Sequence, residues 1–95
     1  MKDKTTIVSK LLPLRTREDL GRAVRQARLD QDIRASHLAR QSGRSRDLLH
    51  RLETGGEVTT GALIDVLRAM GYVLRIEKAG LPTLDEMRQR FTDND

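Results

Sequence analysis

The feature that most constrains the fold is a short stretch of chain bracketed by Gly43 and Gly55. Ser45 can cap the start of a helix with its hydroxyl group, and Gly55 can end that helix in a left-handed turn. Leu49 and Leu52 lie three residues apart, so they share one face of the helix. The sequence therefore predicts a short helix with an apolar back.

The outward face of this helix, which is expected to run from Ser45 to about Thr54, is polar. It carries two arginines, a carboxylate and an imidazole: Arg46, Arg51, Asp47 and His50. These side chains offer hydrogen-bond donors and acceptors to a partner. The face is therefore suited to recognising something polar.

A second short helix is expected just before this one, from Ala35 to Gln41, and it ends at Ser42 and Gly43. Two short helices joined by a tight turn that contains glycine are typical of a helix-turn-helix motif. In that motif the second helix enters the major groove of DNA.

Two further helices are expected, one on each side of this pair. The first is capped by Thr16 and runs to about Leu29. Its start is indicated by the acidic residues that follow the cap, where the helix dipole favours negative charge. Its apolar residues recur at helical spacing: Leu20, Val24 and Ala27. The other is capped by Thr59 or Thr60 and ends at Gly71. Its apolar stripe consists of Leu63, Val66, Leu67 and Met70.

After Gly71 the apolar period changes to two, which predicts a strand. An isolated strand is not stable, and its simplest partner is a second copy of itself across a two-fold axis. Opposite charges favour a register that places Arg75 across from Glu77 of the second copy. The N-terminal arm is the alternative strand partner. The residues expected at the dimer contact are Tyr72, Leu74, Arg75, Ile76 and Glu77.

The chain of 95 residues is expected to form one domain over residues 16–78, flanked by two shorter segments. Residues 1–15 form an N-terminal arm, whose apolar pattern is interrupted by Pro13. Residues 79–95 form a linker, a short helix over 84–91 and a tail. That short helix is marginal alone, so docking on the body, ordering on a partner and disorder all stay open.

Basic charge is concentrated in the body of the chain. Residues 1–78 hold 16 Lys and Arg against 10 Asp and Glu, whereas residues 79–95 hold 2 against 4. Most of the basic residues are arginines, whose planar group suits phosphates and guanine edges. The balance fits a nucleic-acid partner, but it also fits an ordinary soluble helical protein, so charge alone leaves both interpretations open.

Several classes of protein are disfavoured by what the sequence lacks. It has no cysteine, which excludes disulfides and thiolate metal sites and indicates a reducing compartment. No apolar run approaches the roughly 18 residues of a membrane span, and no signal-peptide pattern is present, so a cytoplasmic location and no membrane partner are expected. His37 and His50 fall on different expected helices, and no catalytic cluster is evident. We therefore expect neither an enzyme nor a cofactor.

Several short motifs together carry a resemblance to a known family. They are Asp19-Leu20-Gly21, Leu38-Ala39, Ser42-Gly43, Ser45-Arg46, Leu49, Leu52-Glu53 and Gly55. The chain resembles the XRE/Cro-like helix-turn-helix family, which implies a mainly α, four- to five-helix Cro/repressor-like domain with a C-terminal strand that pairs across a dimer. Within the family it is most similar to HipB-like antitoxin repressors, because Leu67 to Gly71 run straight into the expected strand.

The resemblance implies a dimeric transcriptional repressor that binds a specific sequence in double-stranded DNA. It also raises a HipA-type toxin as a partner, with this chain as the antitoxin. The alternative is a protein-interaction module that neutralises or docks a partner protein through the strand or the segment 81–91. The two interpretations can coexist.

By the same resemblance, the base-reading positions fall on Arg46, Asp47 and Arg51, with His50 beside them. Arg46 would bind guanine N7 and O6, and Asp47 would accept from cytosine N4. Asp47 would equally well orient Arg46 or Arg51 through a salt bridge. Ser45 would cap the helix and bind a phosphate.

The family pattern also implies a structural ion pair, and this sequence departs from the pattern at three places. Glu53 is expected to pair with Arg28. Arg34 stands where a capping Thr or Ser is usual, and it is expected to contact a phosphate instead. Arg44 replaces an apolar residue, which either weakens the packing of the turn or adds a basic group at the groove. Gly56 replaces a frequent Lys.

Overall fold

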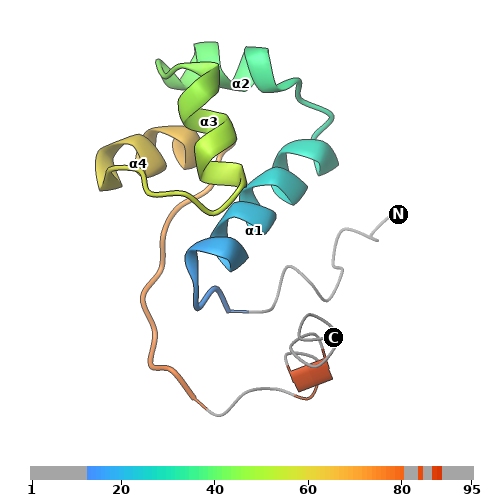
Figure 1. Cartoon of the computed structure of the whole chain (residues 1–95), viewed down its shortest axis with the longest axis vertical. Coiled ribbons are helices and arrows are strands. Elements are labelled where there is room, and N and C mark those ends of the chain that lie inside the picture. Colours follow the sequence, from blue (N-terminus) through green and yellow to red (C-terminus); the bar gives the residue numbers. More distant parts are fainter. Residues whose placement is uncertain (1–12, 81–83, 85–86, 89–95) are drawn as a thin grey trace. The chain divides into compact units, whose positions relative to one another are not determined.

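The computed structural model describes residues 13–80, 84, 87 and 88. Residues 13–80 contain four helices, which confirms the prediction of a mainly α fold (Figure 1). They are α1 (Arg17–Asp30), α2 (Ala35–Ser42), α3 (Arg46–Glu53) and α4 (Thr60–Ala69). All four belong to one compact unit, Leu14–Leu74. None of these helices combines the length and the apolar character that crossing a membrane would require.

The predicted helix starts are confirmed by side-chain caps. The hydroxyl of Thr16 accepts from the Asp19 amide at 3.0 Å, and that of Ser45 accepts from the Leu48 amide at 3.1 Å. The α4 helix is capped by Thr59 rather than by Thr60. Each cap satisfies an amide that has no partner inside its helix. The α2 helix starts after Arg34 with no side-chain cap, as the sequence indicated.

All four helices end in the same kind of turn, with one residue in the left-handed conformation. These residues are Asp32 (φ 59°), Gly43 (φ 74°), Gly55 (φ 89°) and Gly71 (φ 87°). The next amide in the chain donates back to a carbonyl of the last helical turn. The four bonds are Ile33 to Arg28 (3.1 Å), Arg44 to Ala39 (2.9 Å), Gly56 to Arg51 (2.8 Å) and Tyr72 to Leu67 (2.8 Å). This is the Schellman motif, and it reverses the chain sharply after each helix.

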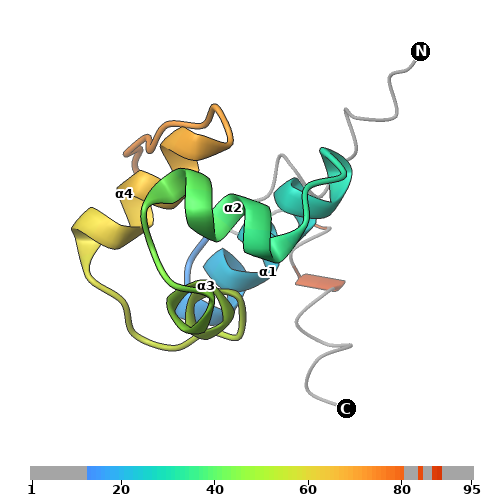
Figure 2. The same ribbon diagram turned by 90° about the horizontal axis from the view of Figure 1, so that it is seen from above.

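The core lies where the apolar stripes of the four helices meet. Its largest fully buried side chains are Val24, Leu38, Leu49, Leu52 and Val66. The α3 helix packs against both α1 and α2, and α2 packs against α4. Figure 2 looks nearly along α3 while α2 runs across the view, so these two helices cross steeply. One side of α3 is therefore enclosed by neighbouring helices.

The strand predicted over Tyr72–Glu77 is absent from this single chain. Residues 72–80 form no regular secondary structure, and all of them are exposed. A strand needs a second strand to satisfy its amides and carbonyls, and the described part of one chain provides none. The arm, which was the alternative partner, lies at residues 1–12 outside the described residues. Pairing with a second copy therefore stays a prediction.

The short helix expected over 84–91 is described at three of its residues. Leu84, Met87 and Arg88 are helical. The rest of the segment lies outside the described residues.

Candidate nucleic-acid interface

The outward face of α3 places the four predicted base-reading residues together. Arg46, Asp47, His50 and Arg51 are all exposed, whereas Leu49 and Leu52 are buried on the opposite side. This division follows from helical spacing, because residues three or four positions apart lie side by side: Arg46 with His50, Asp47 with Arg51, and Leu49 with Leu52. The face carries donors and acceptors suited to the polar edges of bases.

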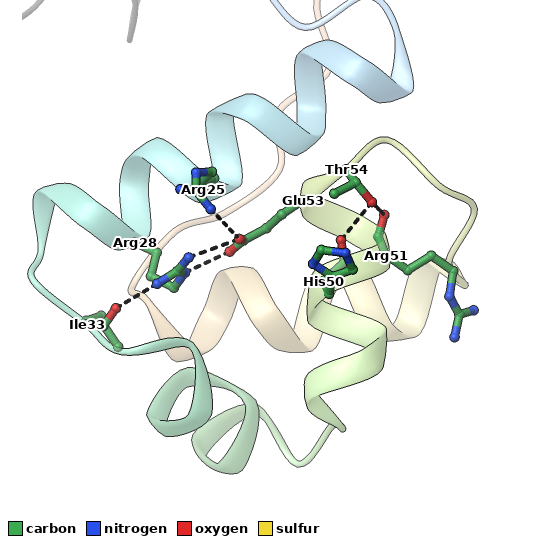
Figure 3. A network of polar contacts seen from close by, with 7 residues as sticks. All are labelled: Arg25, Arg28, Ile33, His50, Arg51, Glu53 and Thr54. Atoms are coloured by element: carbon green, nitrogen blue, oxygen red, sulfur yellow. Dashed lines mark hydrogen bonds and ion pairs between the residues drawn. The ribbon is translucent and has the colours of Figure 1, made fainter.

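None of these four side chains forms an ion pair with another described residue. The carbonyls of His50 and Arg51 accept from the Thr54 hydroxyl at 2.9 and 3.2 Å, which satisfies the backbone at the end of α3 (Figure 3). Asp47 makes no salt bridge to Arg46 or Arg51 in the described chain. The polar groups of this face are thus available to a ligand.

Arg51 is shaped by the glycine that follows α3. A Cβ atom built on Gly56 would lie 2.6 Å from Cγ of Arg51 and 3.1 Å from its carbonyl oxygen. The stem of Arg51 therefore lies against the turn in the space that a side chain would fill, and its guanidinium extends away from the helix (Figure 3). The sequence marked Gly56 as a departure from the family pattern, but only the packing reveals this contact.

A buried ion pair joins the inner side of α3 to α1, as the resemblance predicted. Arg28 of α1 donates through Nε and Nη2 to the two carboxylate oxygens of Glu53, at 2.8 and 3.0 Å, and through Nη1 to the Ile33 carbonyl at 3.1 Å (Figure 3). The two side chains are 9% and 6% exposed. Arg25 adds a longer contact to Glu53 at 3.9 Å. A two-bonded pair of this kind fixes direction as well as distance.

The hydrogen bonds to Glu53 raise the pKa of Arg28 above its ordinary value. Burial opposes this by disfavouring the charged form, and the charge of Glu53 adds to the rise. Arg28 therefore stays charged at every pH at which the protein would be studied.

Gly21 brings α1 and α3 into direct backbone contact. A Cβ atom at Gly21 would lie 2.6 Å from the carbonyl oxygen of Leu52 and 2.7 Å from that of Glu53. No other residue type fits here without moving one of the helices, because the obstructing atoms are backbone. The sequence contained this glycine only as part of a family motif, and its packing role was missed.

The three residues predicted to bind phosphate are held in different ways. Ser45 uses its hydroxyl oxygen as the α3 cap, which leaves its hydroxyl hydrogen to donate to a phosphate. Arg34 is exposed at the start of α2. Arg44 is instead joined to Asp65 of α4, with Nη2 donating to Oδ2 at 2.8 Å. The turn is thus tied to α4 by a polar contact.

Asp65 was not singled out from the sequence. It is the sixth residue of α4, a helix that was recognised only by its apolar stripe. The one usable signal was Arg44 itself, since a half-buried arginine at a packed turn requires an acidic partner. That signal indicates that a partner exists without saying which acid it is.

Other chemistry has little support in the described residues. No group of three or more His, Cys, Asp or Glu in that part of the chain could hold a metal ion. His37 is an exposed residue of α2, as expected. No protein-family model matches the chain, and no curated protein matches it.

Proposed function

We propose that this chain is a sequence-specific, DNA-binding transcriptional repressor of the XRE/Cro-like kind that acts as a homodimer in the cytoplasm. In this proposal α2 and α3 form a helix-turn-helix, and α3 enters the major groove. The observation that carries the proposal is the outward face of α3. Its four polar side chains are unpaired within the described chain, on a helix whose other side is fixed by packing and by the Arg28–Glu53 pair.

The chemistry of this face matches base edges better than it matches a general acidic surface. Arg46 would donate two bonds to guanine N7 and O6, and Asp47 would accept from the amino group of cytosine. His50 and Arg51 lie one turn further along the helix and would read the neighbouring positions. A purely electrostatic surface would have no use for the carboxylate of Asp47.

Phosphate contacts would set the register of α3 in the groove. Ser45, Arg44 and Arg34 surround the turn and the starts of α2 and α3, where helix amides attract anions. The body of the chain also carries most of the positive charge, which supports binding to a polyanion.

Dimerisation is proposed through the segment Tyr72–Glu77. Val73 and Ile76 are 84% and 98% exposed in the single chain, and the segment alternates apolar and polar residues. Pairing with a second copy would satisfy the backbone and place side chains of the two copies beside one another on each face. Two recognition helices would then meet half-sites about one helical turn apart. Light scattering should report a dimer for the natural chain and a monomer for Ile76→Lys.

The second candidate is a protein-interaction module, and the same exposed segment favours it. In that role the segment would bind a different protein, and the HipB-like resemblance suggests a HipA-type toxin. The oligomeric state of the purified chain distinguishes the two roles. A chain that is monomeric at all concentrations, yet co-purifies with the product of a neighbouring gene, would favour the interaction module.

DNA recognition is tested by a mobility-shift titration against the DNA upstream of the chain's own gene. An unrelated duplex of equal length serves as the comparison, at low and moderate salt. We expect preferential binding to the upstream DNA and a steep fall with salt. Arg46→Ala should weaken binding by about 1–3 kcal/mol and relax preference at one base pair.

Arg68→Ala is the matched control, because it removes the same charge from an exposed position on α4. It should change affinity much less than Arg46→Ala. Equal binding to every duplex, unaffected by Arg46→Ala, would contradict the assignment of α3.

A further inference from the structure

The turn between α2 and α3 is held by an ion pair that uses only one edge of an arginine. Both Nε and Nη2 of Arg44 donate to the same oxygen, Oδ2 of Asp65, at 3.2 and 2.8 Å. The side chains of Arg44 and Asp65 are 35% and 38% exposed, so the pair is neither enclosed nor free in solvent. The guanidinium is therefore anchored while part of it still faces water.

The other edge of Arg44 is in a position to bind an anion. A guanidinium has five N–H donors, and its Nη1 group makes no hydrogen bond to any described residue here. Arg44 directly precedes Ser45, whose hydroxyl caps α3. Binding here requires a backbone phosphate at the start of α3 to contact this second edge as well as the cap.

We propose that Asp65 is a positioning residue for DNA binding, which acts by holding Arg44 with one edge so that the other edge meets a backbone phosphate beside the start of α3. The inference rests on the proposed function. Two effects of Asp65 oppose each other. Its charge repels DNA, but its anchor removes the rotamer freedom that Arg44 would otherwise lose on binding. The anchor acts over 2.8 Å, whereas the phosphate would lie beyond the far edge of Arg44, where solvent and salt screen the repulsion more strongly. We therefore take the anchoring effect as the larger one.

The direction in which Asp65→Ala changes DNA affinity distinguishes a positioning role of Asp65 from a simple charge effect. Asp65→Ala makes the chain more positive, so simple charge predicts tighter binding to DNA. Positioning predicts weaker binding, by about fivefold, because the unanchored Arg44 no longer forms its phosphate contact. Asp65→Asn keeps an amide oxygen that accepts from the same edge, and it should restore binding to the level of the natural chain.

The test is a salt titration of DNA binding by the natural chain and its variants at Asp65 and Arg44. The slope of log affinity against log salt should fall by about 0.9 in Asp65→Ala and in Arg44→Ala, as for one lost phosphate contact. The double variant should bind like either single one, since both remove the same contact. Asp65→Ser, too short to reach Arg44, repeats the test with a polar residue in α4.

The matched control is Glu57→Ala. Glu57 pairs with Arg17 at 3.0 Å, so this variant also removes one acid and releases one arginine. It should bind DNA as tightly as the natural chain or more tightly, with an unchanged salt slope. Circular dichroism at the assay temperature gives the folded fraction by which each affinity is corrected.

Three results would overturn the inference. Asp65→Ala could bind as tightly as the natural chain or more tightly, which would make Asp65 only a repelling charge. It could bind more weakly with an unchanged slope after correction for folding, which would make the pair only structural. Failure of the natural chain to bind any duplex would remove the proposed function as well. Binding by the natural chain with an indifferent Asp65→Ala would remove this inference alone.

Discussion

The two sides of α3 differ in what their side chains contact. On the inner side, Leu49 and Leu52 are buried, and Glu53 is bound by Arg28. On the outer side, Arg46 and Arg51 extend into solvent without an ion pair to any described residue. The comparison shows that the residues that fix the position of α3 are not the residues to which the proposed function assigns recognition. Changes on the inner side should therefore alter stability, and changes on the outer side should alter binding.

The largest expected effect is on the inner side, from Gly21→Ala. The new Cβ atom would lie 2.6 Å from the Leu52 carbonyl oxygen, so α1 and α3 must separate. We expect a loss of about 3 kcal/mol in the free energy of unfolding, measured by urea denaturation. The control is Gly61→Ala, because a Cβ there meets nothing closer than 3.8 Å. Equal stability of the two variants would show that α1 and α3 can shift freely.

Removal of the buried carboxylate should have a similar effect. Glu53→Ala leaves the charge of Arg28 buried without its partner, and it should lower the free energy of unfolding by about 3 kcal/mol. The control is Glu57→Ala, whose exposed pair with Arg17 should be worth less than about 1 kcal/mol. If both variants lost the same small amount, the inner pair would not be what fixes α3.

The raised pKa of Arg28 fixes the direction in which this pair's contribution to stability changes with pH. The pKa of Arg28 is raised in the folded chain, so its stabilising contribution is complete below the ordinary pKa of arginine and is lost only above it. The difference in stability between the natural chain and Glu53→Ala should therefore show no loss from Arg28 between neutral pH and about pH 9. A difference that decays over that range would require another titrating group.

A change at Gly56, between the inner and outer sides of α3, should moderately reduce both stability and DNA affinity. Gly56→Ala places a Cβ 2.6 Å from Cγ of Arg51, which forces that side chain off the turn. We expect a loss of about 1 kcal/mol in stability, and about the same in DNA affinity at moderate salt. Arg51→Ala in the Gly56→Ala background should cause no further loss of affinity. Additive losses would show that Gly56 does not act through Arg51.

The smallest effect on stability is expected on the outer side. Asp47 lies in the first turn of α3, where a negative charge is favoured by the helix dipole. Asp47→Asn should therefore cost only about 0.5 kcal/mol of stability. Its main effect should be on base preference, measured by binding to a set of operator variants. An unchanged preference would indicate that the outer side does not read sequence through Asp47.

The predicted helices and the actual helices agree closely because their ends are set by nearby residues. Thr16, Ser45 and Thr59 each bond an amide three residues ahead. Gly55 adopts the left-handed backbone that was expected after α3, and Gly43 adopts it after α2. Asp32 plays the same part after α1, although the sequence indicated only a loop there. Such local rules operate whatever the rest of the chain does.

The expected strand shows the limit of local rules. The alternation over Tyr72–Glu77 is a real feature of the sequence, yet the segment has no regular structure in the single chain. Period-two patterns describe what a strand would present to a partner, and they do not supply that partner. The pattern is therefore informative about an interface and not about the isolated chain.

The sequence by itself determined the four helices, three of the turns that end them and the polar outer face of α3, because these depend on residues within one or two helical turns of each other. Only the tertiary structure decided the other contacts that hold α3 and its turn in place. The contact at Gly21 and the pair of Arg44 with Asp65, 21 residues away along the chain, arise from packing between helices. Sequence spacing carries no information on such distances, since they depend on how the whole core closes.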